Sequence, residues 1–175
     1  MIGFWVILII IILFGLVVFH GSPYVPSHKA DIKQALTKLY KINKDDTLID
    51  IGSGDGAVLR EAIKLGAKRA VGYEINPLLV LISKFLSRKY KNISVILSDF
   101  WFISLPKDTT VIYVFSVTRD IKNIVKLIQK ETNKLNKSMY LISYGNNIEG
   151  LQSIKSVGAY YLYIFKPLQS DKAQV

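Results

Sequence analysis

The chain has 175 residues, enough for one compact domain, and a formal net charge of +10 at pH 7. It contains no cysteine, which excludes disulfides, thiolate metal sites and cysteine nucleophiles. Half of its residues are apolar, a high share for a soluble protein, and the excess is concentrated at the start of the chain.

Residues 2–19 read IGFWVILIIIILFGLVVF and include no charged side chain. As an α-helix this stretch would be roughly 27 Å long, close to the ~30 Å hydrocarbon core of a bilayer. A cleaved signal peptide would need basic residues ahead of the apolar run, and none are present. A buried core helix is rarely apolar over such a length. We therefore predict a single-pass transmembrane anchor over residues 1–20.

The residues that follow the predicted anchor indicate its orientation. Only the α-amine is basic before the apolar run, whereas five lysines follow within a short distance. They are Lys29, Lys33, Lys38, Lys41 and Lys44. The positive-inside rule then places the remaining domain on the cytoplasmic side of a membrane. The net charge could attract anionic lipid, nucleic acid or acidic protein. For a tethered domain, solubility and attraction to the membrane surface are the simpler interpretation.

Beyond the anchor, residues 21–27 form a short connector stiffened by prolines, and Ser27 is a candidate N-cap for the helix that follows. Apolar runs and helical patterns then alternate to residue 168, and residues 169–175 form a tail. Strands are expected at 47–52, 69–75, 93–99, 110–116, 138–145 and, at a sheet edge, 160–165. Helices are expected at 57–65, 76–90 and 119–135, the second opened by Asn76 and Pro77.

Strands rich in Val, Ile and Leu, separated by helices, are typical of an α/β domain. We therefore predict a Rossmann-like domain over residues 28–168, with a mostly parallel central sheet and helices on both faces. Ligands of such sheets bind at the carboxyl ends of the strands, near the switch point beside the first strand.

A glycine-rich turn stands at the end of the first predicted strand, Asp50-Ile-Gly52-Ser-Gly54-Asp-Gly56. Glycines let the backbone turn sharply and approach a ligand closely. Because Gly52, Gly54 and Ala57 also fit the dinucleotide pattern G-x-G-x-x-A, the glycines alone leave the ligand open. Carboxylates at positions 50 and 55 would repel a pyrophosphate, whereas Asp50 would attract a ligand that carries an ammonium group.

Acidic residues also end the next two predicted strands. Glu74 can accept hydrogen bonds from both hydroxyls of a ribose, and Asp99 is placed to accept one from an adenine amino group. With Asp50, these residues suit a ligand that combines an ammonium group, a ribose and an adenine.

This series of residues resembles the motifs of class I, seven-strand, S-adenosylmethionine-dependent methyltransferases. Four segments resemble more narrowly the protein lysine methyltransferases that include the one modifying the ATP synthase c-subunit, together with related small archaeal enzymes. The segments are PYVPS (23–27), IDIGSGDG (49–56), GYEINP (72–77) and SDFW (98–101). The likeness extends over about residues 23–145.

The resemblance implies that S-adenosylmethionine is the cofactor and that segment 23–27 closes over it; the alternative for this segment is a rigid elbow after the membrane. Asp50 and the glycines would lie near the methionine part, Glu74 at the ribose and Asp99 near the adenine. The cofactor-binding residues implied are Tyr24, Pro26, Asp50, Gly52, Ser53, Gly54, Glu74, Ile75, Asp99 and Phe100. Ala57 departs from the pattern, because these relatives usually carry a basic residue there.

The same resemblance implies a lysine acceptor, and the anchor favours a membrane-associated protein as the substrate. Candidates for the wall of the substrate channel are Tyr24, Phe100, Trp101, Phe115 and Ser116. No residue stands out as a general base. The fourth predicted strand ends Phe-Ser-Val-Thr rather than in the Asn/Asp-Pro-Pro-aromatic tetrad of many enzymes that methylate nucleobases or glutamine, so a nucleic-acid partner is not expected. No metal site is expected either, since no His/Asp cluster is present.

Three alternatives remain open. The chain could methylate a lipid, a small molecule or RNA. It could bind the cofactor and a partner protein without catalysis. It could also bind a nicotinamide cofactor, against which Asp50, Asp55 and Asp99 argue.

Overall fold

The computed structural model describes residues 3–5, 8, 28–115, 120–145 and 147–168. Its centre is a seven-stranded sheet in the order β3-β2-β1-β4-β5-β7-β6. The strands are β1 Thr47–Ile51, β2 Arg69–Glu74, β3 Ile93–Leu97, β4 Val111–Phe115, β5 Met139–Tyr144, β6 Lys155–Val157 and β7 Tyr160–Phe165. Strands β1 to β5 pair in parallel, and β7 runs antiparallel to both β5 and β6.

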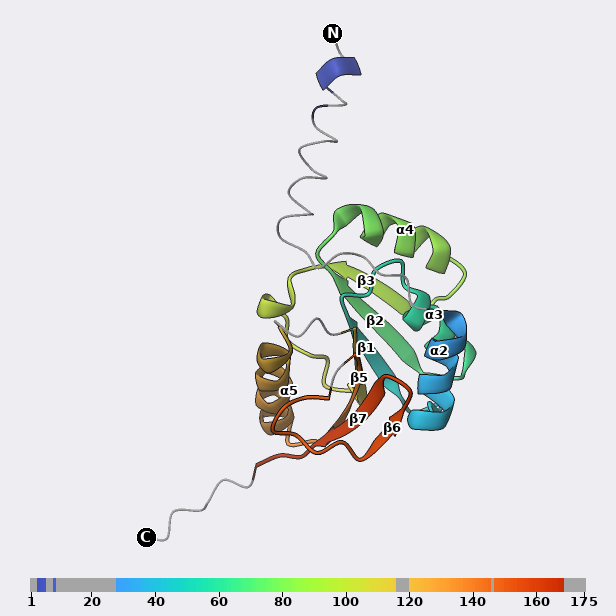
Figure 1. Ribbon diagram of the computed structural model, residues 1–175. Helices are drawn as coiled ribbons and strands as arrows, with labels where there is room; N and C mark the ends of the chain where they lie inside the picture. The colour runs from blue at the N-terminus through green and yellow to red at the C-terminus, as the bar shows by residue number, and fades with distance from the viewer. Residues whose placement is uncertain (1–2, 6–7, 9–27, 116–119, 146, 169–175) are drawn as a thin grey trace.

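Helices lie on both faces of this sheet (Figure 1). Those described are α2 Lys29–Gln34, the π-helical turn η1 Ala35–Leu39, α3 Ala57–Lys64, α4 Pro77–Ser87, the 3-10 turn η2 Phe100–Phe102 and α5 Ile121–Leu135. The first face, which carries Leu48 and Tyr113, packs against α2, η1, α3 and α4. The second face, which carries Ile49 and Ile112, packs against α5. The predicted α/β architecture is confirmed.

The second face is completed by a loop between β3 and β4 that contains only η2 as helical structure. Ile103 and Leu105 from this loop are buried against the sheet. Buried Glu131 of α5 holds the loop, because its carboxylate accepts hydrogen bonds from the Leu105 N–H at 3.3 Å and the Ser104 hydroxyl at 3.4 Å. One long helix, this loop and Ile148 from the segment after β5 therefore cover this face.

Two local predictions were wrong. Residues 160–165 do form a strand, but β7 lies inside the sheet between β5 and β6 rather than at an edge. The true edge strand β6 has three residues, Lys-Ser-Val, which are too few and too polar to stand out in the sequence. Helix α2 has His28 as its N-cap, with no side-chain capping bond, whereas Ser27 lies outside the described residues.

The predicted anchor over residues 1–20 lies almost entirely outside the described residues, which include only 3–5 and 8 of it. Among the described ranges, no helix combines the length and the apolar character needed to cross a bilayer. The connector 21–27 and the tail 169–175 also lie outside the described residues.

Candidate functional site

The glycine turn after β1 needs glycine at three positions. Gly52, Gly54 and Gly56 have φ angles of 78°, 52° and 79°, in the left-handed region that other residues rarely adopt. The Gly52 N–H donates to the Tyr73 carbonyl oxygen at 2.8 Å, and the Gly56 N–H donates to the Ser53 carbonyl oxygen at 2.8 Å. The turn is thereby held against the end of β2 before α3 begins.

Glu74, at the end of β2, links this turn to the start of α4. One carboxylate oxygen accepts the Gly54 N–H at 2.8 Å, and the other accepts the Asn76 N–H at 2.8 Å. Asn76 in turn caps α4 by accepting the Leu78 N–H at 3.0 Å, as predicted. A carboxylate has about four acceptor positions, so the nearly buried Glu74 retains capacity for further donors such as ribose hydroxyls.

Asp50 is the most unusual group of the site. The residue is 2% exposed, and none of the hydrogen bonds between described residues ends on its carboxylate. Burial raises the pKa of its carboxyl well above the ordinary value, and the nearby carboxylates of Glu74 and Asp55 raise it further. A buried carboxylate without donors is costly when ionised. The position would therefore gain strongly from a cationic ligand group.

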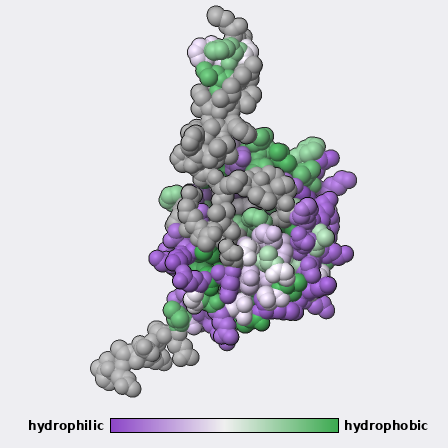
Figure 2. Space-filling view, viewed as in Figure 1, coloured by the Kyte–Doolittle hydropathy of each residue, from purple (hydrophilic) through white to green (hydrophobic). Residues whose placement is uncertain are grey.

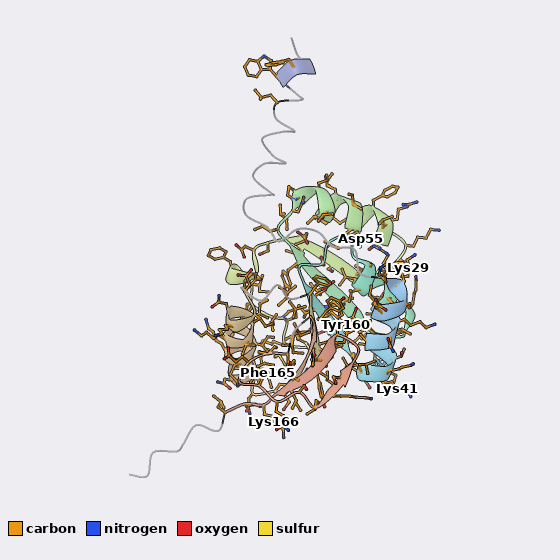
Figure 3. All side chains as sticks on the ribbon, in the orientation of Figure 1. Lys29, Lys41, Asp55, Tyr160, Phe165 and Lys166 are labelled. Carbon is orange, nitrogen blue, oxygen red and sulfur yellow. The ribbon has the colours of Figure 1, made fainter. Side chains whose placement is uncertain are left out.

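Asp55 has a different role from the one predicted. Its carboxylate pairs with the Arg60 guanidinium at 3.0 Å and accepts the Ala57 N–H at 3.0 Å. Figure 3 labels Asp55 near the start of α3. Because the Arg60 guanidinium neutralises this charge, Asp55 does not disfavour a pyrophosphate ligand. Of the two carboxylates in the turn, only Asp50 would still repel one.

Aromatic side chains adjoin Asp50 on the first face of the sheet. Asp50 pairs in register with Tyr113 of β4. One step nearer the carboxyl edge, Phe115 lies opposite Tyr144 of β5, which lies opposite Tyr160 of β7. We call Tyr113, Phe115, Tyr144 and Tyr160 the aromatic row.

The rings of the aromatic row are in contact with one another. Phe115 and Tyr144 stack with their centroids 4.7 Å apart, and Tyr144 meets Tyr160 edge-on at 4.8 Å. The hydroxyls of Tyr113 and Tyr160 lie 3.3 Å apart. Burial raises the pKa of Tyr160, so its hydroxyl stays protonated at neutral pH and is no candidate for a base. Of this row, sequence reasoning singled out only Phe115. The aromatic residues at the other strand ends were visible, but their pairing through an antiparallel strand was not.

Gly72 of β2 is a second residue that sequence reasoning missed. A Cβ atom there would lie 2.6 Å from the Ser53 Cβ and 2.7 Å from the Leu59 Cδ1, closer than atoms pack. The predicted site residue Ser53 is buried, and its hydroxyl finds no hydrogen-bond partner in the described part of the chain. The missing side chain at position 72 thus lets the glycine turn lie directly on β2.

The other predicted residues divide into three groups. Asp99 and Ile75 follow the ends of β3 and β2, and the Ser98 N–H donates to the Glu74 carbonyl oxygen at 3.0 Å, so these strand ends adjoin. Phe100 packs against the core of the second face, away from Phe115. The rest, namely Tyr24, Pro26, Ser116 and the side chain of Trp101, lie outside what the structure describes.

The described residues contain no group of three or more His, Cys, Asp or Glu side chains that could hold a metal ion.

The strand order, the glycine turn after β1 and the acidic residues at the carboxyl ends of β1 and β2 define a class I methyltransferase fold. A crystal structure of an RNA methyltransferase from Salinibacter ruber, in complex with S-adenosyl-L-homocysteine, has the same fold with a TM-score of 0.71. It is 20% identical and covers 83% of this chain and 95% of its own. The family model of the ANTKMT methyltransferase domain matches residues 50–155. The chain belongs to this methyltransferase family.

Two curated relatives are protein lysine methyltransferases. The ATP synthase c-subunit lysine N-methyltransferase of Xenopus laevis is 34% identical over 112 residues, which are 62% of this chain and 48% of that protein. A protein-lysine N-methyltransferase of Saccharolobus islandicus is 30% identical over 115 residues, 62% of this chain and 69% of its own. The chain thus spans about half the length of the first relative and about two thirds of the second. The predicted resemblance is confirmed.

Proposed function

We propose that this protein is an S-adenosylmethionine-dependent methyltransferase that transfers a methyl group to a lysine side chain of a protein. The observation that carries the proposal is Asp50, a buried carboxylate that lies beside a glycine turn and receives no hydrogen bond from the described residues. The ammonium group of the methionine part would supply the missing positive charge. Family membership agrees with this ligand.

The residues present fit the cofactor at each of its parts. Asp50 would hold the ammonium group, the glycine turn would allow close approach of the backbone, and Glu74 would accept from the ribose hydroxyls with its remaining acceptor positions. Asp99 follows the adjoining strand and would face the adenine, and the 43% exposed Ile75 offers apolar contact next to Glu74. When bound, the cofactor supplies a sulfonium methyl group, an electrophile for in-line displacement.

The aromatic row supports a lysine acceptor. The lysine nitrogen must lose its proton to attack, since only the neutral amine has a lone pair, and an apolar aromatic wall lowers the pKa of an ammonium by desolvation. Once its proton has passed to water, the neutral nitrogen would take up the methyl group that the bound cofactor supplies, and the pair of the broken C–S bond would stay on sulfur. Phe115 and Tyr144 end neighbouring strands beside Asp50 and are the residues best placed to orient the acceptor.

We further propose that residues 1–20 anchor the protein in a membrane with the domain, residues 28–168, on the cytoplasmic side, and that the substrate is membrane-associated. The uncharged run at residues 2–19 and the lysines that follow it support this proposal. A tether would raise the local concentration of a membrane-bound substrate.

Calorimetric titration of the full chain in detergent tests the cofactor site. We expect S-adenosylmethionine to bind, and Glu74→Gln to weaken binding by about 30-fold, because hydrogen bonds to charged groups are worth roughly 1.5–3 kcal/mol. Lys126→Ala, on the exposed side of α5, is the matched control and should bind as the parent does. Equal affinity for parent and Glu74→Gln would refute the site.

A labelled-methyl assay on membranes, separated into protein, lipid and RNA fractions, tests the acceptor. The label should enter protein, and mass spectrometry should locate it on lysine. Label in the lipid or RNA fraction would replace the lysine proposal by another acceptor. Cofactor binding without any labelled product would favour a non-catalytic module.

A further inference from the structure

Helix α4 presents its large apolar residues to the outside of the domain. It buries a stripe of Val80, Ser83 and Ser87 against its neighbours. The exposed apolar side chains are Leu78 at 59%, Leu81 at 65%, Ile82 at 38%, Phe85 at 63% and Leu86 at 43%. A surface helix of a globular domain normally shows the opposite pattern, with large apolar side chains facing the core.

Packing fixes this orientation of the helix. A Cβ atom at Gly56 would collide with Ser83, so α4 approaches the glycine turn through a small side chain. Val80 enters the core of the first face next to Val95 of β3. The leucines and Phe85 cannot turn inward without losing this close contact.

The exposed apolar surface extends beyond the helix. Leu97 of β3 is 55% exposed and alternates with Val95, so it lies on the same face of the sheet as α4. Figure 2 shows apolar residues gathered over α4 at the edge of the domain. We call Leu78, Leu81, Ile82, Phe85, Leu86 and Leu97 the α4 apolar surface. Contiguous exposed apolar surfaces of this kind mark interaction sites.

The charged residues of the segment that forms this surface have one sign. Between Glu74 and Asp99 the sequence has no carboxylate, and its basic residues, all exposed, are Lys84, Arg88, Lys89 and Lys91. The Arg88 guanidinium lies 4.2 Å from the centroid of the Phe85 ring. Long basic side chains can extend from an apolar surface toward phosphate groups, and this combination of apolar and basic residues is typical of helices that bind anionic membranes.

We propose that α4 is an interfacial helix that docks the domain on an anionic lipid bilayer. Leu78, Leu81 and Phe85 would insert among the acyl chains, and the basic side chains would meet the lipid headgroups. The helix has eleven residues, about 16 Å of length, which suits a helix lying in the interface rather than crossing it. A second copy of the chain fits less well, since a symmetric contact would oppose two basic sets and the segment 75–98 has no carboxylate to place between them.

Docking through α4 would also orient the candidate site. The helix begins directly after Asn76, whose backbone N–H is bound by Glu74. The cofactor site would therefore lie beside the bilayer surface. This inference concerns membrane contact and does not depend on methyl transfer.

The absence of cysteine makes a direct test possible in the full chain. Leu81→Cys and Phe85→Cys each introduce one labelling site on α4, and Lys126→Cys introduces one on α5 at the other face as the matched control. Each variant is labelled with an environment-sensitive fluorophore and reconstituted into phosphatidylcholine/phosphatidylglycerol vesicles, with and without a lipid spin-labelled near the headgroup.

We expect the labels at 81 and 85 to shift to the blue on reconstitution and to be quenched by the spin label at least about twofold more than the label at 126. Quenching should weaken in phosphatidylcholine alone and in Lys84→Glu and Lys89→Glu backgrounds. Quenching equal to that at 126 would overturn the proposal, even if an anchor elsewhere holds the protein on the vesicles. A blue shift on the vesicles without any quenching by the spin-labelled lipid would indicate self-association and would equally overturn it.

Discussion

Two buried aspartates lie at opposite ends of β1 and have opposite surroundings. Asp46, just before the strand, is 3% exposed and accepts hydrogen bonds from the Tyr40 hydroxyl at 2.8 Å, the Thr110 hydroxyl at 2.8 Å and the Asn43 N–H at 2.9 Å. Asp50 is 2% exposed and receives none from the described residues.

We infer from this difference that the Asp46 carboxylate stabilises the fold and that the Asp50 carboxylate binds a ligand. Three donors from two segments stabilise Asp46, so its burial contributes to folding. Burial and the nearby carboxylates of Glu74 and Asp55 raise the pKa of Asp50, and residues with a pKa perturbed in this way are frequent at functional sites. The two ends of one strand should therefore respond in opposite ways to mutation.

The largest effect is expected for Asp46→Ala. Removing the carboxylate leaves the hydroxyls of Tyr40 and Thr110 and the Asn43 N–H without their acceptor, so the free energy of unfolding should fall by about 3 kcal/mol. Urea unfolding monitored by circular dichroism measures this change. The folded fraction should still bind S-adenosylmethionine with the parent affinity. If Asp46→Ala instead lowered the affinity for S-adenosylmethionine and left the stability unchanged, Asp46 rather than Asp50 would be the binding residue.

Asp50→Asn should lower the affinity for the cofactor without lowering the stability. The neutral amide has nearly the same shape, so the affinity for S-adenosylmethionine should fall by about 30-fold, as expected for one lost charge-assisted contact. The ligand-free protein should be as stable as the parent or more stable, because the buried charge is gone. Calorimetric titration and urea unfolding of the same sample measure both quantities. Destabilisation similar to that of Asp46→Ala would show that Asp50 is structural after all.

Gly72→Ala tests the close contact between the glycine turn and β2. The new methyl group would lie within 2.7 Å of the Ser53 Cβ and the Leu59 Cδ1, so we expect the free energy of unfolding to fall by about 2 kcal/mol. The displaced turn should also bind the cofactor less well. Gly66→Ala is a control for the left-handed backbone, since Gly66 has φ +100 and open space at its Cβ. Gly66→Ala should lower the free energy of unfolding but leave the affinity for S-adenosylmethionine unchanged.

The smallest effect is expected from pH. The folded-state pKa of Asp50 is raised, so the native protein binds this proton more tightly than the unfolded chain. This contribution to stability is present in full below the pKa of the unfolded chain and is lost as pH rises through the folded pKa.

A cationic ligand favours the ionised form of Asp50. The affinity for S-adenosylmethionine should therefore decrease as pH falls below the folded pKa, by about tenfold for each pH unit at most. Titrations of the parent and Asp50→Asn across this range measure the effect. If the affinity of both proteins depends on pH to the same extent, a titratable group other than Asp50 causes the effect.

Much of this molecule was predictable from local sequence. The strands β1 to β5, the glycine turn after β1 and the start of α4 at Asn76 and Pro77 follow from apolar periodicity, from glycine at positive φ and from capping, all of which depend on neighbouring residues. The acidic residues at the ends of β1, β2 and β3 could be placed at one edge, because parallel strands bring their carboxyl ends together.

Only the tertiary structure decided which of these residues meet. The donors to Asp46 come from Tyr40, Asn43 and Thr110, whereas Asp50 receives none from the described residues. The glycine turn marked Asp50 in the sequence, but nothing in the sequence showed this difference in hydrogen-bond donors. The aromatic row forms because β7 inserts antiparallel beside β5. Helix α4 turns its leucines outward because Ser83 fits against Gly56. Sequence periodicity reports the type and spacing of side chains along one segment, but contacts, burial and pKa depend on segments that only folding brings together.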